Sequence, residues 1–153
     1  MSTFEEVEQL LSELDAFVAG GKTDAIVSAA EDKLAVSFPP SFREYLLRWG
    51  NVSCDGYEYY GLTQNDDFDN ASVPNFVWFT LKKRRDVGLP QSLLVFRNEN
   101  DEEYLCIDTS QALDGDERKV VIWDNIERSI SRSVDTSFIE YIREELLEVA
   151  EDY

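Results

Sequence analysis

The stretch that decides the fold is Phe38-Pro-Pro-Ser-Phe-Arg-Glu-Tyr-Leu-Leu-Arg-Trp-Gly50-Asn51. Pro40 suits the first turn of a helix, because its missing N–H has no hydrogen bond to lose there. Four apolar residues then recur at i, i+3, i+4 and i+7, which gives the helix one broad apolar face. Gly50 follows the last of them and can take the left-handed conformation that ends a helix. We therefore predict a short helix over residues 39–50 whose apolar face is buried; that face consists of Phe42, Tyr45, Leu46 and Trp49.

Two more helices are predicted before this stretch. Thr3-Phe-Glu-Glu6 has the pattern of a capping box, in which a hydroxyl and a glutamate satisfy free N–H groups at a helix start. Apolar residues follow at helical spacing as far as Val18, and Gly20-Gly21 should stop this first helix. Thr23 or Asp24 can cap the second helix. The inner face of the second helix is predicted to consist of Ile26, Ala29, Ala30 and Leu34.

After Asn51 the pattern changes to short strands with polar connections. Residues 57–62 alternate and are aromatic, which favours a strand, and residues 64–72 are polar, which favours a surface loop. A helix is predicted over residues 76–85, ending in the basic cluster Lys82-Lys-Arg-Arg85. That cluster would interact favourably with the dipole at the end of its helix.

The C-terminal half is predicted to form an antiparallel meander. Leu93–Phe96 and Tyr104–Ile107 are continuous apolar runs, typical of strands buried on both faces, and the polar turn between them predicts a hairpin. Lys119–Trp123 is the next strand, and Ser137-Phe-Ile-Glu140 is a capping box that opens a final helix. Residues 1–153 are therefore predicted to be one α+β domain, with helices packed on an antiparallel sheet that has a central three-stranded meander.

The chain also resembles the SUKH superfamily, the Smi/Knr-like proteins. The resemblance rests first on the Phe38–Asn51 stretch, with its apolar-Pro entry, its Tyr-Leu pair and its Gly-Asn end. It continues in chain order through several shorter motifs and so implies the same α+β fold for most of the chain. These motifs are Ile26, Glu31 and Leu34, then Tyr60-Gly61-Leu62, Leu93–Phe96, Leu105-Cys-Ile-Asp108 and Ser137-Phe-Ile-Glu-Tyr141.

The charge of the chain limits its partners. The 153 residues carry 32 acidic and 14 basic side chains, a formal net charge of −18. Such a charge disfavours direct binding to nucleic acid or to anionic membranes, where cations are needed. It favours a basic protein partner, although solubility alone would explain it equally well. No run approaches the roughly 18 apolar residues of a membrane span, and the N-terminus lacks the pattern of a signal peptide, so a cytoplasmic location is expected.

The residue types argue against catalysis. The chain has no histidine, the residue most often used as a general acid or base near neutral pH and as a metal ligand. It has no glycine-rich phosphate loop either. Cys54 and Cys106 are isolated, so they form no zinc or redox motif, and Cys106 should be a buried small hydrophobe. We expect no enzymatic activity, no cofactor and no bound metal.

Eight residues are candidates for partner binding. Tyrosine provides contact area at low entropic cost, and dense exposed carboxylates can attract a basic partner. For each group there is an alternative interpretation: the tyrosines could be core residues, the aspartates a solvated loop or a divalent-cation site, and the hairpin acids a solubilising turn. The candidates are Tyr57, Tyr59, Asp66, Asp67, Asp69, Glu99, Asp101 and Glu102.

The resemblance implies a function as well as a fold. Bacterial single-domain members of the superfamily are immunity proteins that neutralise secreted polymorphic toxins, often nucleases, and other members are regulatory interaction modules. The expected function is therefore an immunity or antitoxin protein that binds a basic cognate toxin, with a regulatory module as the alternative. An acidic inhibitor could compete for the cationic surface with which a nuclease holds its substrate.

Overall fold

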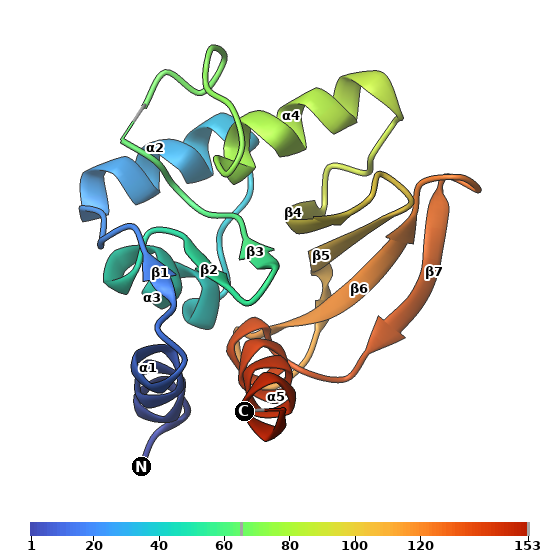
Figure 1. Cartoon of the computed structure of the whole chain (residues 1–153). Coiled ribbons are helices and arrows are strands. Elements are labelled where there is room, and N and C mark those ends of the chain that lie inside the picture. The colour runs from blue at the N-terminus through green and yellow to red at the C-terminus, as the bar shows by residue number, and fades with distance from the viewer. Residues whose placement is uncertain (65, 153) are drawn as a thin grey trace.

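The computed structural model describes residues 1–64 and 66–152, and this part of the chain forms an α+β fold with five helices and two antiparallel sheets (Figure 1). The predicted fold class is confirmed. The helices are α1 (Thr3–Glu13), α2 (Asp24–Leu34), α3 (Pro40–Arg48), α4 (Phe76–Asp86) and α5 (Phe138–Glu151). The small sheet consists of β1 (Phe17–Val18), β2 (Val52–Cys54) and β3 (Tyr57–Tyr59). The large sheet consists of β4 (Leu93–Glu99), β5 (Glu103–Ala112), β6 (Arg118–Asp124) and β7 (Ser129–Val134).

The α3 helix lies at the centre of the core, as its apolar spacing predicts. The side chain of Phe42 is 0% exposed, and its ring centroid lies 4.9 Å from that of Phe76 on α4 and 4.9 Å from that of Phe138 on α5. Both contacts have the edge-to-face geometry that aromatic pairs favour. Tyr45, Leu46 and Trp49 are buried beside Phe42. The predicted aromatic face is thus confirmed as the contact between three helices.

The N-terminus of α3 receives its cap from another part of the chain. Pro39 offers no side-chain cap. Instead the carboxylate of Glu117, just before β6, accepts hydrogen bonds from the Ser41 N–H at 3.0 Å and from the Ser41 hydroxyl at 3.0 Å. A carboxylate at this end also interacts favourably with the helix dipole. This contact fastens α3 to the large sheet.

Two glycines allow the chain to pass close to itself after α3. Gly50 has a φ of +73°, the left-handed conformation predicted for it. A Cβ atom on Gly61 would lie 1.8 Å from the Gly50 carbonyl oxygen, so only glycine fits there. The Leu62 N–H donates to this same carbonyl at 2.9 Å, which places the end of the small sheet against the end of α3.

The N-terminal prediction needs two corrections. The cap of α1 is Ser2, whose side chain accepts from the Glu5 N–H, whereas the Thr3 hydroxyl donates to Glu140 of α5 at 2.8 Å. The helix also ends well before Gly20-Gly21: Asp15 has a φ of +53°, and Phe17–Val18 pair with β2 as strand β1. A left-handed residue interrupts the helix, so the apolar spacing of residues 17 and 18 does not continue it.

The large sheet has one strand more than predicted. The strands β4, β5 and β6 form the expected meander, and β7 extends it in the order β4-β5-β6-β7. The centres of β4 and β5 are buried on both faces, as their continuous apolar runs indicate. In contrast, β7 is polar and exposed along most of its length, so it lacks the apolar pattern that would reveal a strand.

Three further predictions concern the helix α4, the two cysteines and membrane-spanning segments. Asn75 caps α4, and the basic end of that helix is used structurally: Arg84 donates to the Leu34 carbonyl at the end of α2 at 2.9 Å. Cys54 and Cys106 are free and buried. Among the described residues, no helix is both long and apolar enough to span a lipid bilayer.

Candidate functional site

A bulge in β4 builds the candidate site. Val95 pairs with Cys106 and Arg97 pairs with Leu105, so Phe96 is an extra residue in β4. A bulge of this kind can turn two neighbouring side chains to the same face. The ring of Phe96 lies 5.0 Å from that of Phe138, and the guanidinium of Arg97 binds Glu145. Both side chains therefore point toward α5.

Arg97 is the centre of a largely buried polar network. Its two terminal nitrogens donate to the two oxygens of Glu145 at 2.5 and 2.7 Å, the paired geometry that makes Arg–carboxylate contacts strong. The Tyr59 hydroxyl donates to the same carboxylate at 2.9 Å. The side chains of Arg97 and Glu145 are 8% and 14% exposed. The network thus joins β3, β4 and α5 around one ion pair.

Burial and charge shift the pKa values in this network in the expected directions. Burial raises the pKa of Tyr59 well above its usual range, and the neighbouring Glu145 carboxylate raises it further. Burial alone would lower the pKa of Arg97, but its hydrogen bonds to Glu145 and the charge of that carboxylate more than compensate, so the pKa is raised. Tyr59 is therefore neutral and Arg97 charged at neutral pH.

The structure separates the two tyrosine candidates. Tyr59 is 0% exposed, so the prediction that it contacts a partner is wrong: its hydroxyl is held inside the network and its ring is part of the core. Tyr57 is only partly buried. The Arg97 guanidinium lies 4.7 Å from the centroid of its ring, a cation–π distance that orients it. Of the two candidates, only Tyr57 offers surface to a partner.

The three acidic candidates of the β4–β5 hairpin lie close together, and one of them contacts Arg97. Glu99 pairs with Arg97 at 2.6 Å, which connects it to the same network. Asp101 and Glu102 are exposed at the tip of the β4–β5 hairpin. The tip is ordered, because the Asp101 N–H donates to the Asn98 side chain at 2.8 Å and the Asn98 amide donates back to Asp101 at 3.0 Å. The structure therefore brings Glu99, Asp101 and Glu102 together at one hairpin, and Tyr57 lies against Arg97 of the same hairpin.

The loop that carries Asp66, Asp67 and Asp69, the aspartate loop, is attached to α2. Asp66, Asp67 and Asp69 are exposed, as predicted for a surface loop. Asp69 pairs with Lys33 of α2 at 2.9 Å, and Phe68 between the acids is buried. Among the described residues, no group of three or more acidic, cysteine or histidine side chains is placed to hold a metal ion.

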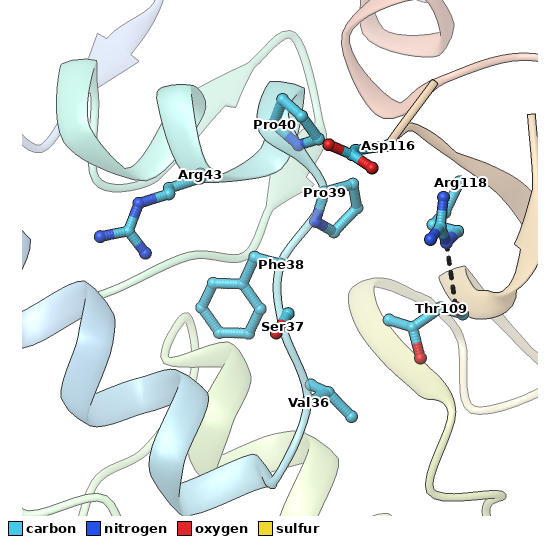
Figure 2. Close-up of a pocket in the computed structure, with 9 residues that line it drawn as sticks. All are labelled: Val36, Ser37, Phe38, Pro39, Pro40, Arg43, Thr109, Asp116 and Arg118. Carbon is cyan, nitrogen blue, oxygen red and sulfur yellow. Dashed lines mark hydrogen bonds between the residues drawn. The ribbon is translucent and has the colours of Figure 1, made fainter. Parts of the chain in front are cut away.

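Three hollows in the surface are relevant. The first, of about 300 Å³, adjoins the hairpin tip and has Glu99, Glu102 and Tyr141 in its wall. The second, of about 490 Å³, separates the Val36–Pro40 segment from the β5–β6 end of the sheet (Figure 2). Figure 2 shows Arg118 across this cleft from the prolines, where its Nε donates to the Thr109 carbonyl at 3.1 Å. That arginine fastens two strands together.

The third hollow, of about 570 Å³, is an acidic groove that the sequence did not reveal. Its carboxylates come from the β5–β6 turn, from the segment before α5 and from α5 itself, so no single acidic run marks it. One of them, Glu117, is engaged as the cap of α3. The carboxylates in its wall are Asp114, Glu117, Asp135, Glu140 and Glu144.

Comparison with known proteins gives three findings. A family model described as SMI1-KNR4 cell-wall matches residues 3–147 of the chain. No curated protein matches the chain. Among solved structures, a protein from Pseudomonas syringae pv. tomato is similar in fold, with a TM-score of 0.64 and 20% sequence identity over 95% of this chain and 98% of that one.

Proposed function

This chain belongs to the SMI1-KNR4 family, and on that basis we propose that it is an immunity protein that neutralises a cognate toxin by direct binding. The partner is a basic protein. The sequence resemblance favours the nuclease domain of a polymorphic toxin as this partner. The protein itself has no catalytic role and acts in the cytoplasm. The family membership and the absence of histidine from the chain support this proposal.

The binding surface is chosen on one observation, the clustering of exposed carboxylates at the tip of the β4–β5 hairpin. Asp101 and Glu102 are exposed on an ordered tip, and Glu99 of the same hairpin pairs with Arg97, whose guanidinium lies 4.7 Å from the centroid of the Tyr57 ring. An ordered surface loses little conformational entropy when a partner binds, so more of the contact energy remains as affinity. With a net charge of −18, the chain would also steer a cationic partner toward it.

Growth rescue tests this function. The partner is first isolated by co-purification from a native lysate, identified, and expressed alone in a host cell. We expect the partner to be basic and toxic by itself, and co-expression of this chain to restore growth. An acidic partner would contradict the electrostatic argument. A harmless partner would indicate the alternative, a regulatory interaction module.

A further inference from the structure

The β6–β7 hairpin exposes apolar side chains beside the acids. Ile126, in the turn, is 75% exposed, and Ile130, on β7, is 42% exposed. Among the described residues no other isoleucine is exposed, so both exposed isoleucines belong to this hairpin. Two exposed apolar side chains on one hairpin supply the apolar contact area that the core of an interface needs.

The turn that carries Ile126 is ordered by its own hydrogen bonds. The Asp124 carboxylate accepts from the Ile126 N–H at 2.9 Å and from the Glu127 N–H at 3.1 Å. Arg128 completes the turn with a φ of +55°. These contacts hold the backbone of the turn in one conformation, so Ile126 is presented on a fixed support.

Hydrogen bonds from Asn125 join this turn to the acidic tip of the other hairpin. The Asn125 N–H donates to the Glu102 carbonyl at 2.9 Å, and its side-chain amide donates to the Asp101 carbonyl at 2.9 Å. The exposed isoleucine therefore lies on the same end of the sheet as the carboxylates of Asp101 and Glu102. Glu127, which is exposed, adds a further negative charge next to Ile126.

A buried tyrosine lies close to both hairpin turns: Tyr104 of β5 pairs with Asn98 of β4 and with Trp123 of β6. The hydroxyl of Tyr104, which is 0% exposed, has no hydrogen-bond partner among the described residues. Burial, and then the charge of Asp101, raises the pKa of Tyr104 to about 12, while Arg128 opposes that shift. The ring of Tyr104 lies 5.4 Å from that of Phe79, so the side chain faces α4. Leaving such a donor unpaired costs free energy.

We propose that Ile126 is the apolar anchor of a protein-binding surface at the hairpin end, and that its partner presents apolar side chains surrounded by lysines or arginines. This proposal rests on the binding function above and names the chemistry of the partner. The carboxylates of Asp101 and Glu102 guide the approach of the partner, and Ile126 supplies contact that slows its release. The acidic groove around Glu117 has comparable charge but, among the described residues, no exposed large apolar side chain.

A peptide titration tests this surface without a known toxin. The probes are Lys-Lys-Phe-Lys-Lys amide and the same peptide with serine in place of phenylalanine, added separately to ¹⁵N-labelled protein. We expect the phenylalanine peptide to bind about tenfold more tightly, because only it can bury apolar area against Ile126. Its largest chemical-shift changes should fall on residues 101–102 and 126–130.

Two variants provide the controls. Ile126→Ser should remove the difference between the peptides, whereas Leu147→Ser, at an apolar residue exposed on α5, should leave it unchanged. Equal affinity of the two peptides for the wild type, or shift changes centred on the groove around Glu117, would overturn the proposal. This outcome is distinct from failure of the immunity function, because the peptides report on the surface whether or not the natural partner is toxic.

Discussion

Replacing Phe42 with alanine should lower the free energy of unfolding by about 3–5 kcal/mol, the range for removing a large aromatic side chain from a core. The ring is 0% exposed and meets aromatic rings of α4 and α5 as well as its own helix. A domain of ordinary stability has about 5–15 kcal/mol in total, so this single change should remove a large part of it. Chemical denaturation followed by tryptophan fluorescence measures the effect.

Phe17→Ala is the matched control for this prediction. It removes the same side chain from β1, where Phe17 is 62% exposed, and should change the free energy of unfolding by only about 0.5 kcal/mol or less. If Phe42→Ala were no more destabilising than Phe17→Ala, the α3 face would not be the centre of the core.

Removing Glu145, the buried partner of Arg97, should lower the free energy of unfolding almost as much as Phe42→Ala does. Glu145→Ala leaves the Arg97 guanidinium and the Tyr59 hydroxyl without the carboxylate that both contact. Breaking a buried ion pair on one side costs about 3–5 kcal/mol, and because Glu99 would still pair with Arg97 we expect a loss at the lower end of this range, about 3 kcal/mol. Thermal and urea unfolding of the purified variant would measure the loss.

Glu148→Ala controls for the change of helix charge and propensity. Glu148 lies on the same helix but is exposed, so its removal should change stability by only about 0.5 kcal/mol. A second variant, Arg97→Met with Glu145→Leu, should recover much of the loss, since an apolar pair leaves no unpaired charge. Equal stability of Glu145→Ala and Glu148→Ala would show that the network contributes nothing.

Periodicity and capping predicted the elements whose pattern is local in the sequence. The aromatic face of α3 and the Ser137 cap of α5 are of this kind, and both are found as expected. Strands β1, β2 and β7 were not predicted, because β1 has only two residues, β2 has only three, and β7 carries polar, exposed side chains. Such strands are specified by the partner strand with which they pair, and a local pattern does not contain that information.

The sequence predicted the acids of the candidate site and Tyr57, but not the buried ion pair beneath them. Glu99, Asp101 and Glu102 form a visible cluster in a turn, whereas the ion pair between Arg97 and Glu145 joins residues far apart in sequence. The bulge that aims Arg97 at α5 left no signal that we recognised. Ile126 did leave a signal, namely an apolar residue within a polar turn, and reading that turn for exposed apolar side chains could have found it.

The most direct test of the account is the rate at which the co-purified partner associates with two charge-neutralised variants. One variant is Asp101→Asn with Glu102→Gln at the hairpin tip, and the matched control is Asp66→Asn with Asp67→Asn in the aspartate loop, where the acids are also exposed. We predict that the hairpin variant associates about three- to tenfold more slowly at low salt, with a flatter salt dependence, while the loop variant stays close to the wild type. A hairpin variant that associates at the wild-type rate at low salt would contradict the claim that this acidic surface binds the partner.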